Sequence, residues 1–181
     1  MLYHEDSVAV IGARAADKDG LEMAYFFSQQ SVRQGRPVIS RLALGCDTVA
    51  HRGCLDAGGH TIAVVASGLD ITHPKVNKAL QEDIVASGGT ILSEYPFGVK
   101  ANPTRLVARC RIQAALSYTV IVAQCPIISG TMYAVRFAKT YGRNVYAVQF
   151  DRQNELNTGN KFLLDYGIAQ PISIEYPNKK I

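Results

Sequence analysis

The sequence predicts an α/β fold with a doubly wound, mostly parallel sheet and helices on both of its faces. Short β-branched runs alternate with helical patterns along nearly the whole chain. The runs are apolar throughout, as in strands that helices bury on both faces. This pattern is typical of a Rossmann-like architecture, in which ligands bind beyond the carboxyl ends of the strands. The residues that follow each strand are therefore the candidate site.

The composition indicates one globular domain, expected to span residues 1–181. Of the 181 residues, 48% are hydrophobic and 19% are charged. A domain of this size buries roughly 70% of the surface of its unfolded chain. Residues 1–6 are largely polar and acidic, so we expect no signal peptide. No apolar run approaches the roughly 20 residues that cross a bilayer, so we expect no membrane partner.

The four cysteines indicate a reduced, cytoplasmic compartment. They form no C-x-x-C pair, and disulfides are rare in the cytosol. Cys46, His51 and Cys54 match no usual zinc spacing. We therefore expect neither a metal nor a cofactor.

The first strand is expected at residues 7–11, and the helix after it is expected to open at Asp19. Glu22 stands three residues further on, which suits a capping box, and Gly35 is suited to end the helix. The expected inward stripe of this helix consists of Leu21, Ala24, Tyr25, Ser28 and Val32.

The same alternation continues to the end of the chain. Further strands are expected at residues 37–40, 61–66, 90–93, 119–123, 144–148 and 171–174. Further helices are expected at residues 47–57, 74–86, 105–116, 131–139 and within 158–166. Pro74 suits a first helical turn. Residues 96–103 hold two prolines and a glycine and are expected to form a loop, and residues 178–181 are expected to fray.

Basic residues concentrate in one half of the chain. No acidic residue stands between Glu94 and Asp151. The basic residues of that stretch are Lys100, Arg105, Arg109, Arg111, Arg136, Lys139 and Arg143. Such a half favours a polyanionic partner, because each neutralised phosphate releases condensed counterions. The alternative is a solvated face that acids balance in space, namely Asp56, Asp70, Glu82 and Asp83.

Candidate phosphate-binding residues follow the first two strands. Gly12 allows the backbone to turn tightly beside a ligand, and Arg14 adds a permanent cation. After the second strand, Ser40 offers a hydroxyl group and Gly45 a permissive backbone.

Asp47 and His51 stand at the start of the next expected helix. Asp47 suits a helix cap. His51 lies four residues further on, so we expect a hydrogen bond between the carboxylate and the imidazole. We favour a structural role for that pair over a catalytic one.

A third candidate turn follows the strand at residues 119–123. Ser129, Gly130 and Thr131 lead straight into a helix, and small and hydroxyl residues at a helix N-terminus form a phosphate nest. Three such turns on one edge of one sheet predict a cradle for anionic oxygen atoms.

The helix at residues 105–116 adds arginines to this edge. Arg105 and Arg109 are four residues apart and share a face, whereas Arg111 projects elsewhere. We expect at least one of them to face the sheet edge and another to be solvated or paired internally.

Ordered motifs run from Val8 to about Gly167. They are VAVIGAR (8–14), the series from Ser40 to His51, GGHTIAVVASGLD (58–70), Pro74 with Asn77, SEYPFG (93–98), RCRIQAALS (109–117), SGT (129–131), GRNVYAV (142–148) and the pair Gly159 and Asn160. In order and spacing these motifs resemble those of the DNA-processing proteins of the DprA/Smf family. That family belongs to a wider Rossmann-type group that includes the LOG phosphoribohydrolases.

The resemblance implies binding of single-stranded DNA and help in loading a RecA-type recombinase during natural transformation. It also implies contacts of Arg14, Ser129, Gly130 and Thr131 with backbone phosphates. Arg109 and Arg111 match a family segment beside the same pocket. The departures from the family pattern are Arg41 for glycine, Leu44 for a basic or polar residue, Cys110 for asparagine, Leu106 and Val107 for phenylalanine and proline, and Gln149 and Phe150 for proline and glycine.

The sequence therefore predicts a non-catalytic single-stranded DNA-binding protein of DNA uptake and recombination. The LOG proteins carry P-G-G-x-G-T-x-x-E, whereas this chain has isoleucine at positions 127 and 128 and alanine at position 134. Alanine cannot supply the acid–base chemistry of the lost carboxylate. The alternative is a sensor of a nucleotide-derived small ligand. Pairing into a homodimer through exposed apolar residues such as Tyr146 and Phe150 is left open.

Overall fold

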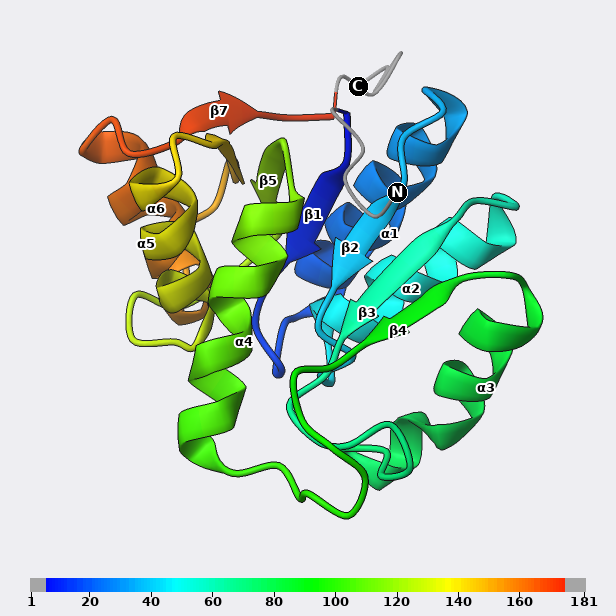
Figure 1. Ribbon diagram of the computed structural model, residues 1–181. Helices are drawn as coiled ribbons and strands as arrows, with labels where there is room; N and C mark the ends of the chain where they lie inside the picture. The colour runs from blue at the N-terminus through cyan, green and yellow to red at the C-terminus, as the bar shows by residue number, and fades with distance from the viewer. Residues whose placement is uncertain (1–5, 175–181) are drawn as a thin grey trace.

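A computed structural model describes residues 6–174, so the expected frayed end at residues 178–181 lies outside the described part. Seven parallel strands form one sheet in the order β4-β3-β2-β1-β5-β6-β7 (Figure 1). The strands are β1 (Val8–Ile11), β2 (Val38–Ser40), β3 (Thr61–Val64), β4 (Thr90–Leu92), β5 (Thr119–Val122), β6 (Asn144–Val148) and β7 (Gln170–Ile172). The expected Rossmann-like α/β fold is confirmed.

Helices cover both faces of the sheet (Figure 1). The helices of one face are α1 (Lys18–Arg33), α2 (Cys46–Asp56) and α3 (Lys78–Ala86), which a short 3₁₀ turn, η1 (Lys75–Asn77), precedes. Those of the other face are α4 (Pro103–Leu116), α5 (Thr131–Thr140) and α6 (Thr158–Asp165), which η2 (Glu155–Asn157) precedes. The chain changes face between β4 and β5 because α4 crosses back over the sheet.

The strand order reverses beside β1. Its neighbours are β2, which follows in sequence, and β5, which the chain reaches only after β4. Ile11 pairs with Val122, so β1 and β5 end at the same level. Their following loops lead to helices on opposite faces and open a crevice between them.

The core lies on both sides of this sheet. Successive residues of β1 alternate between the two layers: Ile11 packs in the cluster under α4, α5 and α6, whereas Val10 packs in the cluster under α1 and α2. Both side chains are completely buried.

Of two expectations about α1, the capping box was wrong and the inward stripe was right in part, at Ala24 and Ser28. Its N-cap is Asp17, whose side chain accepts a hydrogen bond from the Gly20 amide, so Asp19 and Glu22 form no capping box. The buried stripe consists of Gly20, Met23, Ala24, Phe27, Ser28 and Ser31. Tyr25 is only half-buried because it lies against α2, where its hydroxyl donates to Asp56.

Two further expectations need correction. Helix α4 begins at Pro103 rather than at residue 105, because Asn102 caps it and proline suits the first helical position. Tyr146 and Phe150 are half-buried against the core cluster under α1 and α2. They are less exposed than expected, and the homodimer stays a prediction.

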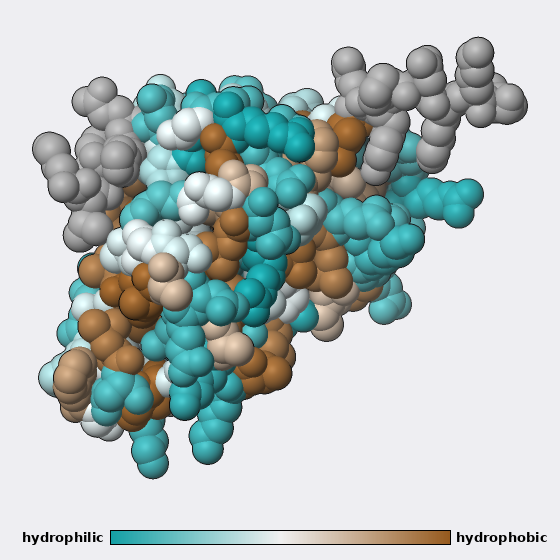
Figure 2. All heavy atoms as spheres, turned by 90° about the vertical axis from the view of Figure 1, so that its right-hand side faces the viewer, coloured by the Kyte–Doolittle hydropathy of each residue, from teal (hydrophilic) through white to brown (hydrophobic). Residues whose placement is uncertain are grey.

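The acids that could have balanced the basic stretch are engaged elsewhere. Asp83 pairs with Arg52 and Glu82 with Lys78, while Asp70 accepts from the Gly98 amide. The edge that carries β4 and α3 mixes hydrophilic and apolar side chains (Figure 2). Among residues 6–174, no helix combines the length and apolar character that crossing a membrane requires.

Candidate functional site

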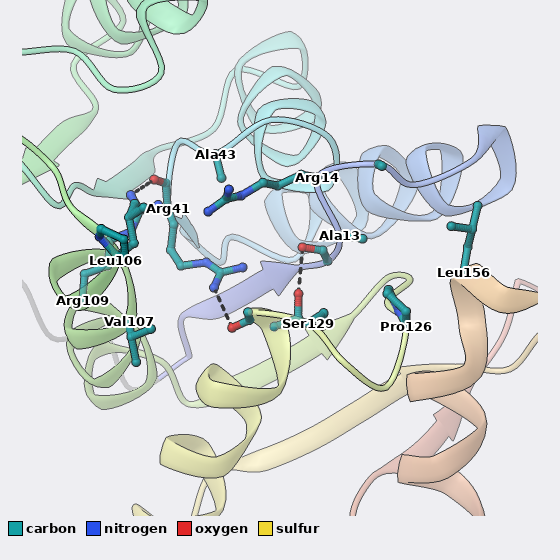
Figure 3. A pocket seen from close by; sticks show the side chains of 15 residues that line it. Ala13, Arg14, Arg41, Ala43, Leu106, Val107, Arg109, Pro126, Ser129 and Leu156 are labelled. Carbon is teal, nitrogen blue, oxygen red and sulfur yellow. Dashed lines mark hydrogen bonds between the residues drawn. The ribbon is translucent and has the colours of Figure 1, made fainter.

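The loop after β1 packs closely against the start of α2. A Cβ atom on Gly12 would overlap the side chain of Cys46, so only glycine fits there. Burial raises the pKa of Cys46 to about 12, so its thiol stays neutral. Two residues further on, Arg14 is exposed, and its side chain reaches across the adjoining cavity (Figure 3).

Ser40 and Gly45 support the loop after β2 from outside the cavity. The Ser40 side chain is fully buried and donates to the Val10 carbonyl oxygen at 2.8 Å. Gly45 has a φ of 72°, and a Cβ atom there would overlap the Ala13 carbonyl oxygen. Both residues were expected to contact phosphate, but the structure gives them a positioning role.

Arg41 is a buried cation in the wall of the cavity. Its Nε lies 3.3 Å from Asp47 Oδ2, and its Nη1 reaches the Gly130 carbonyl oxygen and Cys110 Sγ, both at 3.4 Å (Figure 3). Burial disfavours the cation, but the Asp47 carboxylate raises the pKa of Arg41 above its ordinary value. Arg41 is therefore charged. In the sequence it appeared only as a departure from a family pattern.

Asp47 and His51 do not form the expected pair. Gly45 is the N-cap of α2, and Asp47 binds Arg41 instead of capping the helix. His51 Nδ1 lies 2.7 Å from Thr61 Oγ1, which donates its own hydrogen to the Val38 carbonyl oxygen. Nδ1–H is therefore the donor to Thr61. Burial lowers the pKa of His51 to about 4, so the ring is neutral.

Helix α4 places Arg109 beside Arg41. Asn102 begins the helix by accepting from the Arg105 amide at 2.9 Å. Arg109 is 3% exposed, and its Nη1 donates to the carbonyl oxygens of Arg41 and Val64. Its buried Nε has no hydrogen-bond partner among the described residues. Burial lowers the pKa of Arg109 to about 10, and the Arg41 cation acts in the same direction. Arg109 is still charged at neutral pH.

The other arginines of α4 lie outside the cavity. Arg111 forms an ion pair with Glu94 at the surface, and Arg105 lies over the Tyr95 ring, 5.2 Å from its centroid. As expected, Arg105 and Arg111 are engaged elsewhere while Arg109 faces the sheet edge. Arg111 was also an expected phosphate-binding residue, and the structure does not bring it to the site.

The loop after β5 forms the third side of the cavity, beside the loops after β1 and β2. Thr131 Oγ1 donates to the Gly12 carbonyl oxygen at 2.8 Å and so joins this loop to that of β1. The buried Asn160 side chain accepts from the Cys125 amide and donates to the carbonyl oxygens of Val122, Ala123 and Val148. The loop start is thereby fixed to the ends of two strands.

Together the three loops and α4 line a cavity of about 520 Å³ (Figure 3). The charged and polar side chains that line it are Arg14, Arg41, Arg109, Ser129 and Thr131, with the backbone of Gly12 and Gly130. Apolar lining comes from Pro103, Leu106, Val107, Pro126 and Leu156. Among the described lining residues there is no aspartate, glutamate, histidine or cysteine. The cavity can therefore hold an anion that carries an apolar group.

Most of the expected site residues meet at this cavity. Those that line it are Gly12, Arg14, Arg109, Ser129, Gly130 and Thr131. The sequence missed Arg41 and the apolar wall. Their signals were the position of Arg41 directly after a strand and the spacing of Leu106 three residues before Arg109, which puts both on one helix face.

The family model for DNA recombination-mediator protein A matches residues 1–177 of the chain. The chain belongs to this family. It is 38% identical over 164 residues to DNA processing protein DprA of Streptococcus pneumoniae, covering 88% of this chain and 56% of that protein. It is 39% identical over 141 residues to protein Smf of Synechocystis, covering 78% of this chain and 35% of that protein. The chain thus spans about a third to a half of the length of these curated relatives.

Solved structures of the family share the fold. The crystal structure of S. pneumoniae DprA superposes with a TM-score of 0.84 at 37% identity, covering 92% of this chain and 58% of that chain. Helicobacter pylori DprA, whose structure concerns its mode of binding single-stranded DNA, gives a TM-score of 0.83 at 32% identity, with coverage of 92% and 75%. The expected membership of the DprA/Smf family is confirmed.

Proposed function

We propose that this chain is a non-catalytic single-stranded DNA-binding protein that acts in DNA uptake and recombination. The observation that carries the proposal is the convergence of Arg14, Arg41 and Arg109 on one cavity whose described lining contains no acid. Such a cavity attracts phosphate groups and disfavours neutral or cationic ligands. The DNA-binding mode described for the H. pylori relative supports single-stranded DNA as the source of those phosphates.

The proposed contacts come from side chains and from backbone. Arg14 and Arg109 supply cations, and Arg41 joins them as a third guanidinium group. Gly12 and the turn of Ser129, Gly130 and Thr131 offer backbone amides, and Ser129 a hydroxyl group, to phosphate oxygen atoms, as loops before a helix do in other phosphate sites.

The chemistry of the lining supports the proposed absence of catalysis. Acid–base or nucleophilic catalysis requires a titratable or nucleophilic group within reach of the substrate. In the described lining only hydroxyl groups and arginines are available. Ala134, where the LOG proteins carry glutamate, is buried in the core under α5. We expect no release of ribose phosphate from AMP above background, and measurable release would contradict this part of the proposal.

The test of the proposal is a binding titration with a fluorescent oligo-dT strand at low salt, followed by anisotropy. We expect saturable binding, and competition by unlabelled single strands more than by duplex. No binding at high protein concentration would overturn the proposal.

The wider role follows from the resemblance. We extend the proposal to protection of single strands in the cytoplasm, to help in loading a RecA-type recombinase, and to a homodimer. Adding this chain should accelerate strand exchange by a recombinase on DNA that is coated with single-strand-binding protein. Sedimentation should report twice the monomer mass. Unchanged exchange rates or a monomeric species would remove the corresponding extension.

A second candidate is a sensor of a nucleotide-derived small ligand. The observation that favours it is the cavity volume, which lies within the roughly 300–1,000 Å³ of small-molecule sites. A thermal-shift comparison of nucleotides with oligonucleotides separates the candidates, because a ligand at about one hundred times its Kd adds about 2.7 kcal/mol to stability. We expect the larger shift with oligonucleotides.

A further inference from the structure

The positive charge around the cavity exceeds what one phosphodiester group neutralises. Three guanidinium groups line it, and the carboxylate that pairs with one of them, Asp47, stands behind Arg41. Subtracting this one negative charge from the three positive charges leaves an excess of about two. Among the ion pairs of the described residues, none involves Arg14 or Arg109.

One of the two excess charges, that of Arg109, is held where water cannot easily screen it, whereas Arg14 is exposed. Arg109 is 3% exposed, and its buried Nε has no hydrogen-bond partner among the described residues. Arg109 donates to the Arg41 carbonyl oxygen, so the two cations are neighbours and repel each other. Burial is the main reason that the pKa of Arg109 is lowered, and the Arg41 cation acts in the same direction. An anion of charge two would relieve this repulsion more fully than an anion of charge one.

The space beside the arginines is larger than a phosphate group needs. The cavity has an apolar wall that includes Leu106 and Val107 of α4. A smaller hollow of about 50 Å³ adjoins it and shares Arg14, Ala43, Leu106 and Arg109 with it, while His73 and Pro74 line its other side. A sugar and a base can therefore occupy the same site as the phosphate.

We propose that the cavity selects a nucleotide that carries a terminal phosphate monoester, a dianion, over an internal phosphodiester, a monoanion. The inference rests on the proposed function and names the part of the strand that enters the cavity. The same chemistry is found at a phosphorylated strand end and in a free nucleoside monophosphate. Arg14, Arg41 and Arg109 would be the residues that determine this specificity.

The test compares matched oligo-dT strands that differ only at their ends. We expect a strand with a terminal phosphate, at the 5′ or the 3′ end, to bind about tenfold more tightly than the same strand with two hydroxyl ends, because it gains charge-assisted hydrogen bonds. Thymidine monophosphate should compete for the site, and thymidine should not.

Arg14→Gln tests the origin of the preference, because Arg14 is exposed and its substitution should leave the fold intact. The preference for phosphorylated ends should fall toward unity in Arg14→Gln. It should persist in Arg136→Gln, which removes an exposed arginine of α5 that does not line the cavity. A preference that Arg14→Gln leaves unchanged would overturn the assignment.

The outcomes separate this inference from the proposed function. Equal, saturable binding of phosphorylated and hydroxyl-ended strands would overturn the inference and leave the proposed function standing. Binding of thymidine monophosphate without binding of any strand would overturn the proposed function and support the terminal-phosphate site. Binding of neither would overturn both.

Discussion

At the scale of single residues, the site depends on a buried ion pair that the sequence pattern did not reveal. Arg41 and Asp47 are 6% and 0% exposed, and each satisfies the charge of the other. Removing one partner of a buried pair leaves an uncompensated charge in a low-dielectric environment, whereas removing both does not. Arg41 also donates to the Gly130 carbonyl oxygen, so the pair holds two of the three loops together.

The Arg41–Asp47 pair yields a double-mutant prediction. Arg41→Met should lower the free energy of unfolding by roughly 3–5 kcal/mol, because it leaves the buried Asp47 carboxylate without its cationic partner. The double variant Arg41→Met, Asp47→Asn should recover much of that loss. Urea denaturation of the wild type and three variants gives the coupling energy, and strict additivity of the two single losses would refute this account.

His51 yields a prediction about pH. Its pKa is about 4 in the folded protein and about 6.5 in an unfolded chain, so only the unfolded chain takes up the proton between these values. Its contribution to stability is complete above pH 6.5 and is lost as the pH falls toward 4. The loss is on the order of 3 kcal/mol.

Urea denaturation between pH 7 and pH 4.5 measures this effect. In His51→Asn the decline of stability with falling pH should be shallower than in the wild type. The exposed His60 provides the matched control, because His60→Asn should keep the wild-type decline. Identical slopes for His51→Asn and the wild type would contradict the assignment.

At the scale of elements, loops and helix starts bring the site together. Helix α4 begins at the Asn102 cap and carries Arg109 under the loop after β2. Helix α2 begins directly after its N-cap Gly45, which packs closely against the backbone of the loop after β1. These two helix starts decide how closely the loops after β1 and β2 approach each other.

Gly45 yields the prediction at this scale. Gly45→Ala should destabilise the protein by roughly 3 kcal/mol or more, because the positive φ strains alanine and the Cβ atom meets the backbone of Ala13 and Arg14. Gly98→Ala is the matched control. Its φ is 83° and a Cβ atom there meets nothing within 4 Å, so it should lose only about 1–2 kcal/mol.

Thermal and urea unfolding of both variants measure the difference. DNA binding should weaken in Gly45→Ala even where the protein stays folded, because the loop that carries Arg14 must move. Equal losses of stability in the two variants would show that close packing at Gly45 has no part in the fold.

At the scale of the whole molecule, the arrangement of charge matters more than its sum. The formal net charge is only +4. Asp83 and Glu82, which lie outside the basic stretch, pair with Arg52 and Lys78 and therefore leave the edge of the cavity positive. Long-range attraction of this kind depends on ionic strength. DNA binding should therefore weaken steeply with salt.

The salt dependence gives a prediction for one contact. The slope of log K against log salt is negative. Each phosphate contact that the protein loses reduces the magnitude of this slope by about 0.7 for a single strand. Arg14→Gln should reduce the slope by about that amount and weaken binding across all sequences. Arg136→Gln, with the same change of net charge, should alter the slope less. Equal effects of the two variants would indicate a diffuse basic surface in place of a defined cavity.

The sequence by itself determined the succession of strands and helices and the edge at which the site lies. Hydrophobic periodicity is local, and parallel strands necessarily bring their carboxyl ends to one edge, so Gly12, Arg14 and the turn of Ser129 to Thr131 could be placed together. Boundaries shifted where a cap competed, as at Asp17 and Asn102.

Only the tertiary structure decided which side chains face the cavity. Arg41 turns inward because Asp47 is within reach. Of the two arginines that share a face of α4, only Arg109 lines the cavity, whereas Arg105 lies over the Tyr95 ring. Ser40 and Gly45 contact β1 and its loop and do not line the cavity, because β1 and its loop occupy the space beside them. The direction of a side chain depends on where its element packs and on which partner it meets there, and residues distant in sequence supply both.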